Sequence, residues 1–155
     1  MFFLVLLACS GESSAPTCTD ASALEVGSMS ATVDGAEWTS AATWMWQGES
    51  LQITTEAADG WRFTFVAQTT SDGTTVKTAA AAALPVEVSL TDAGGGWVLA
   101  YPDSGDSLTS DLGGGSLNIS ASDDTTLQAC FSFDAANDGG DALTVAGGAV
   151  NAEPF

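Results

Sequence analysis

The stretch Leu127-Gln128-Ala129-Cys130-Phe131-Ser132-Phe133 decides the fold, because its apolar residues recur at every second position. A period of two is typical of a β-strand with one face in a hydrophobic core. The same alternation of apolar with polar residues recurs along the chain, at 29–33, 51–54, 61–65, 86–90, 97–101, 117–119 and 143–145. The sequence therefore predicts an all-β protein.

Turn signals separate these runs at intervals of roughly 10–20 residues, a spacing typical of antiparallel sandwiches and barrels. They are Asp-Gly pairs at 34–35, 59–60 and 72–73 and glycine-rich clusters at 94–96, 113–115 and 137–140. We predict a single antiparallel β-sandwich or partly open β-barrel over residues 28–151. Ala79 to Ala83 remain open between a short helix and an edge strand, since alanine favours helix and Pro85 would end one.

The N-terminus contains a lipobox-like run, Leu6-Leu7-Ala8-Cys9, after an apolar segment. Residues 1–8 read as a signal peptide, and its missing basic region suggests a start codon further upstream. We expect Cys9 to carry the lipid and residues 9–27, rich in Ser, Thr and Ala, to form a flexible tether. Ser10 favours the outer membrane of a Gram-negative bacterium as the location.

The charge of the chain excludes several partners. Twenty acidic residues face only two basic ones, Arg62 and Lys77, and histidine is absent. Nucleic acids and anionic lipid headgroups are bound mainly through basic groups, so neither is an expected ligand. The expected membrane contact is the lipid anchor alone.

Two cysteines remain once Cys9 is assigned to lipid, and an exported chain meets an oxidising compartment. We therefore expect a disulfide between Cys18 and Cys130, with two unpaired thiols as the alternative. Because Cys130 alternates with the apolar residues of its strand, its side chain should lie on the outer face, where the N-terminal segment can reach it.

Three stretches resemble a family of small, uncharacterised bacterial lipoprotein β-domains. They are Ser30-Ala31-Thr32-Val33-Asp34-Gly35-Ala36-Glu37-Trp38, Gly114-Gly115-Ser116-Leu117-Asn118-Ile119-Ser120 and Phe131-Ser132-Phe133-Asp134-Ala135-Ala136-Asn137. The resemblance implies an all-β domain displayed at the envelope, and it supplies no catalytic residues.

Catalytic signatures are weak. Without histidine the chain has no Ser-His-Asp or Cys-His arrangement and no usual zinc site. Asp103-Ser104-Gly105 matches the aspartic-protease loop, but Pro102 and Asp106 depart from its flanking pattern. We therefore expect no enzymatic activity and no catalytic residues.

Binding candidates come from acidic loops and aromatic residues. Asp134, Asn137, Asp138 and Asp141 in one loop, with Asp103 and Asp106 in another, offer oxygens to calcium, although such residues are also common in ordinary turns. Trp38, Trp61 and Trp97 are expected in the core. Trp44 and Trp46 share a strand face, and they either belong to the core as well or form an exposed pair that stacks on a sugar. We predict a non-catalytic structural or binding lipoprotein of the cell envelope with no cofactor, the alternative being a calcium- or carbohydrate-binding module.

Overall fold

The structure, a computed structural model, describes residues 18–91 and 93–155. Cys9, the predicted signal peptide (1–8) and most of the predicted tether lie outside the described residues. The elements are η1 (Cys18–Ala23), β1 (Ser28–Val33), β2 (Ala36–Gln47), β3 (Ser50–Thr55), β4 (Trp61–Ala67), α1 (Val76–Ala82), β5 (Val86–Ser89), β6 (Gly96–Pro102), β7 (Leu108–Ser122), β8 (Leu127–Ala136) and β9 (Ala142–Pro154). Among the described helices, none has the length and apolar character needed to cross a bilayer.

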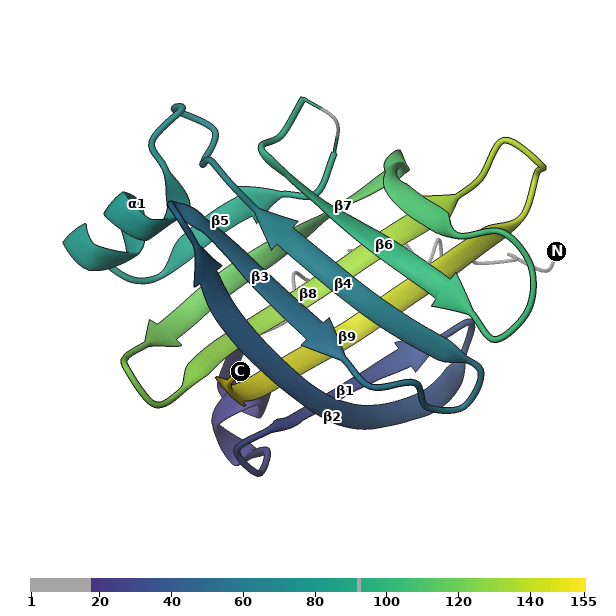
Figure 1. Cartoon of the computed structure of the whole chain (residues 1–155), viewed down its shortest axis with the longest axis horizontal. Coiled ribbons are helices and arrows are strands. Elements are labelled where there is room, and N and C mark those ends of the chain that lie inside the picture. Colours follow the sequence, from purple (N-terminus) through teal and green to yellow (C-terminus); the bar gives the residue numbers. More distant parts are fainter. Residues whose placement is uncertain (1–17, 92) are drawn as a thin grey trace, which may run out of the picture.

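Eight antiparallel strands close into a barrel, with β5 as one extra strand (Figure 1). The ring runs in the order β7-β6-β4-β3-β2-β1-β9-β8 and closes through the pairing of β7 with β8. The all-β prediction is confirmed. Of the two predicted architectures the barrel is the one formed, and its ring is closed.

The two long strands β2 and β7 each change pairing partner along their length, and this change allows the ring to close. The first half of β2 pairs with β1 and its second half with β3. β7 pairs with β6 only near Leu108 and Thr109, and its later part lies between β5 and β8. Where β6 and β7 separate, the buried Ser110 hydroxyl accepts a hydrogen bond from the Val98 amide (2.8 Å), so this backbone donor stays satisfied.

Aromatic rings from non-adjacent strands fill the barrel interior. Phe63 and Phe65 of β4 meet Phe131 and Phe133 of β8, with ring centroids 4.7 Å apart for Phe65–Phe131 and 5.6 Å for Phe63–Phe133. All four rings are at most 3% exposed. An eight-stranded barrel is just wide enough to be filled by side chains, and these rings fill it.

The expected core position of Trp97 is wrong. Gly96, Val98 and Ala100 are the buried residues of β6, so Trp97 lies half-buried on the outer face. The cause is cross-strand pairing, because Val98 stands opposite Phe65 and Ala100 opposite Phe63. Facing two large rings, only small side chains fit on the inner face of β6.

Trp38 is buried as expected, and its Nε1 donates to the Ala58 carbonyl (2.8 Å). Trp61 is partly buried and packs against the core.

Two local ambiguities are resolved by the structure. The alanine run forms helix α1, capped by Thr75, whose hydroxyl accepts a hydrogen bond from the Thr78 amide. Gly113 to Gly115, expected to form a turn, lie inside β7, where the register with β8 shifts. A Cβ at Gly113 would overlap the Asp134 backbone, so glycine permits the close approach of the two strands here.

The segment before β1 is packed against the barrel. η1 contacts β8 and β9, and Ala21 within it is fully buried. Cys130 lies on β8, is 2% exposed and is disulfide-bonded. Its pairing with Cys18 stays a prediction, because the Cys18 side chain is outside the described part of the structure.

We expect Phe63→Ala to lower the free energy of unfolding by about 3–5 kcal/mol, because it removes a ring that contacts Trp38, Trp61 and Phe133. Equilibrium denaturation in urea measures the change. Thr64→Ala, the next residue on β4 and not part of the core, is the control and should change stability by less than about 0.5 kcal/mol. Equal effects of the two variants would contradict a barrel interior filled by these rings.

Candidate functional site

A hollow of about 330 Å³ lies at the barrel end next to α1. We call it the Trp46 hollow. It is lined by Trp44, Trp46, Lys77, Ala80, Ala81, Ser122, Asp123 and Asp124. These residues come from the end of β2, from α1 and from the β7–β8 turn, which Figure 1 shows at one end of the barrel.

The two tryptophans lie on the inner face of β2. Trp44 pairs with Ile53 and Trp46 with Leu51, and both partners are fully buried. The indoles meet edge to face, with centroids 6.2 Å apart and planes at 86°. Trp44 is 6% exposed and supports Trp46, which is half-buried and lies closer to the end of the strand.

Helix α1 places the only lysine of the chain at this hollow. Val76, fully buried, fixes the first turn of the helix, and the next residue is Lys77. The Lys77 ammonium lies 5.9 Å from the centroid of the Trp46 ring and donates a hydrogen bond to the Gly48 carbonyl (3.3 Å). This distance is within the range of a cation–π contact. Lys77 therefore connects α1 to the β2–β3 turn.

Asp123 organises the β7–β8 turn on the opposite rim. Its Oδ1 accepts hydrogen bonds from the Thr125 amide (2.7 Å), the Thr125 hydroxyl (2.7 Å) and the Thr126 amide (2.8 Å). These bonds, with that of the Thr125 side chain the largest cause, lower the pKa of the Asp123 carboxyl to about 2. Asp123 is therefore an anion at neutral pH, and Asp124 beside it is exposed.

One residue from each of the two predicted calcium loops lines the same hollow at the other end of the barrel. Asp106 and Asp141 line one hollow of about 270 Å³, together with Trp61. Within its own loop, Asp141 accepts a hydrogen bond from the Asn137 side chain (3.0 Å).

The other predicted calcium ligands do not line this hollow, and Asp134 accepts from the Thr144 hydroxyl (2.7 Å). In residues 18–91 and 93–155, no group of three or more His, Cys, Asp or Glu side chains is placed to hold a metal ion. Asp103, Ser104 and Gly105 lie in the exposed connection between β6 and β7.

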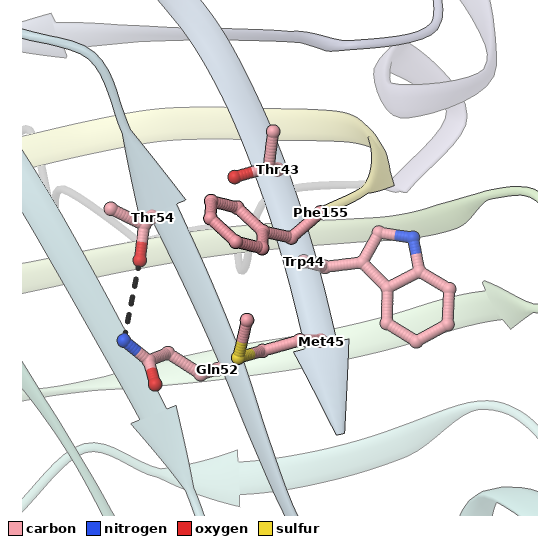
Figure 2. A pocket seen from close by; sticks show the side chains of 6 residues that line it. All are labelled: Thr43, Trp44, Met45, Gln52, Thr54 and Phe155. Carbon is pink, nitrogen blue, oxygen red and sulfur yellow. Dashed lines mark hydrogen bonds between the residues drawn. The ribbon is translucent and has the colours of Figure 1, made fainter. Parts of the chain in front are cut away.

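A third hollow, of about 190 Å³, lies on the outside of the barrel. Figure 2 shows Phe155 beside Thr43 and Met45, with the Trp44 indole pointing away from them. Gln52 and Thr54 complete the lining and hydrogen-bond to each other (3.4 Å). Since no charged side chain lines this hollow, it offers a ligand less chemistry than the Trp46 hollow does.

Sequence reasoning found Trp44 and Trp46 but missed their partners. Lys77, Ser122 and the two aspartates are distant in sequence from β2, and only the closed barrel brings them together. The run Ser122-Asp123-Asp124-Thr125-Thr126 is a recognisable turn signal, yet nothing in it indicates which strand lies opposite.

We expect Asp123→Asn to weaken the dependence of stability on acid pH. The unfolded chain binds a proton at Asp123 near pH 3.8, whereas the folded chain binds it only near pH 2. The free energy of unfolding should therefore fall as the pH drops from 3.8 to about 2. Asp72, whose pKa is also lowered to about 2, leaves part of this dependence in the variant. Urea denaturation across this pH range gives the slope. Thr64→Ala, which removes no carboxyl group, is the control whose slope should match that of the wild type. If the slope of unfolding free energy against pH were the same in Asp123→Asn as in the wild type, the ionised Asp123 carboxylate would not stabilise the β7–β8 turn.

The chain matches no family model, no curated protein and no solved structure at a significant level. The resemblance to small lipoprotein β-domains accordingly stays a prediction.

Proposed function

We propose that this chain is a non-catalytic cell-envelope lipoprotein that holds a binding domain close to a membrane, with the Trp46 hollow as its binding site. The observation that carries the proposal is the convergence of indole, ammonium, hydroxyl and carboxylate groups in that hollow. Pockets that bind small ligands combine an aromatic surface with a few polar groups in this way. The aromatic rings inside the barrel leave the ends as the places for a ligand.

The electrostatics favour binding over catalysis. A general acid at neutral pH needs a carboxyl whose pKa is raised. In the described part of the chain, the two carboxyls with a clearly shifted pKa are Asp72 and Asp123, and both are lowered to about 2 by hydrogen bonds. Asp123 at the hollow is therefore better suited to accept hydrogen bonds from a ligand than to transfer protons.

The membrane contact in this proposal is a lipid on Cys9, at the outer membrane. A net charge of −18 opposes direct adhesion to anionic headgroups, so the anchor has to provide the attachment. Cys18, where the packed segment begins, follows Cys9 by nine residues. A chain of that length reaches at most about 30 Å, so the barrel stays near the membrane surface.

The anchor and the disulfide are checked by the intact mass of the mature protein from host membranes. We expect a diacylglyceryl adduct on an N-terminal Cys9, and a gain of two hydrogen masses on reduction from the Cys18–Cys130 bond. Cys9→Ser should lose the diacylglyceryl adduct, whereas Cys18→Ser should keep the adduct and lose the mass gain on reduction. A mature chain that begins upstream of Cys9, or one that begins at Cys9 without the lipid adduct, would rule out the anchor.

The binding role is checked with protease-treated cell envelopes of the host as the probe. The full chain carrying Cys9→Ser should co-sediment with them, and the additional change Trp46→Ala should reduce the bound fraction at least about tenfold. Trp97→Ala is the matched control, because Trp97 is also half-buried but lies outside the hollow. Co-sedimentation that is absent, or that is equal in both variants, would overturn the Trp46 hollow as the binding site.

A further inference from the structure

We propose that the Trp46 hollow binds one neutral pyranose ring of a glycan. The inference rests on the proposed function only in taking this hollow as the binding site, and it does not depend on the lipid anchor. The aromatic surface, the polar rim, the local charge and the size of the hollow all fit such a ring.

The aromatic surface suits the apolar face of a sugar ring. Trp46 is half-buried, so part of its indole remains open, and the edge-on contact with buried Trp44 holds its orientation. Ala80 and Ala81 of α1 border the same space with methyl groups only. A pyranose presents C–H groups on its flat face, and a rigid indole receives such a face at low entropic cost.

The polar rim matches hydroxyl groups, which donate and accept hydrogen bonds at once. Lys77 supplies donors, Asp123 and Asp124 supply acceptors, and the Ser122 hydroxyl can do either. At Asp123, Oδ1 takes the hydrogen bonds of the turn while Oδ2 takes none of them. Adjacent hydroxyls on a ring could therefore bridge the two rims.

The charges at the hollow argue against ionic ligands. Two carboxylates on the rim and a net charge of −18 repel anions. A cation would be repelled by the Lys77 ammonium, which lies 5.9 Å from the Trp46 centroid. A neutral ligand with many hydroxyls avoids both costs.

The size of the hollow limits how much of a glycan it can hold. Its volume of about 330 Å³ lies at the lower end of the range for small-molecule sites, ~300–1,000 Å³. The hollow is open toward solvent on the side of exposed Lys77, Ala81 and Asp124. A single ring, terminal or with one linked neighbour outside, is what fits.

The test is a titration of the full chain carrying Cys9→Ser, followed by the NMR signals of the tryptophan indole N–H groups. The probes are methyl β-D-glucopyranoside, methyl β-D-galactopyranoside and N,N′-diacetylchitobiose. Sorbitol has the hydroxyls without a ring face, choline is the cationic probe and glucuronate the anionic one. We expect saturable shifts of the Trp44 and Trp46 signals with at least one of the three sugars, and none with sorbitol, choline or glucuronate.

Variants locate the binding. Trp46→Ala should weaken sugar affinity about tenfold or more, and Asp124→Asn about threefold to tenfold, whereas Trp97→Ala and Asp138→Asn should leave it unchanged. Ala81→Met fills the hollow from an exposed helix position with a good helix former, so it tests the site even where Trp46→Ala fails to fold. It should reduce binding at least about tenfold.

The outcomes separate this inference from the proposed function. Absence of shifts with all three sugars, or sugar binding that survives Ala81→Met, overturns the pyranose inference. Choline binding without sugar binding overturns it as well, while it leaves the hollow as a binding site. Envelope binding that depends on Trp46 but comes without binding of these sugars has the same meaning.

Discussion

The contact between the phenyl rings of β4 and β8 is the constraint on which the rest of the structure depends. Phe63 and Phe65 reach Phe131 and Phe133 across the barrel, between strands that do not pair with each other. Aromatic pairs at such distances add about 0.5–1.5 kcal/mol to the burial of their area. They also determine which face of each neighbouring strand must be small, as Val98 and Ala100 of β6 illustrate.

A barrel filled in this way differs from one that encloses a ligand. The rings occupy the space that a larger barrel would leave for a bound molecule. The groups available to bind a ligand therefore lie at the ends of the barrel, where strands stop and loops begin. The end near α1 gathers Trp46, Lys77 and Asp123, whereas at the opposite end Asp141 is bonded within its own loop. The asymmetry arises in part from α1, which brings the Lys77 ammonium to the hollow at this end of the barrel.

The period of two and the Asp-Gly turns were enough to predict the strands, because both are local. Closure was not predictable to the same degree, since sandwich and barrel share these local signals and differ only in which strands pair. The inward face of β6 was misjudged because Trp97, Leu99 and Tyr101 form a regular alternation of large side chains. The residues that face inward, Val98 and Ala100, are instead those that fit opposite Phe65 and Phe63. For the candidate site, Trp44 and Trp46 were found from their shared face. Lys77, Asp123 and Asp124 were missed because sequence does not show which end of a barrel a turn will reach.

The position of the two basic residues ties the charge of the chain to its site. The chain has a net charge of −18 and therefore many carboxylates that could pair with a basic side chain. Both basic side chains, Arg62 and Lys77, nevertheless lie over aromatic rings. The Arg62 guanidinium lies 4.7 Å from the centroid of Tyr101, its cross-strand partner on the outer face. Lys77 instead joins two elements, since it contacts Trp46 and the Gly48 carbonyl from α1. The same side chain thus shapes the hollow and supplies its one ammonium group, so the shape of the site and its chemistry depend on a single residue.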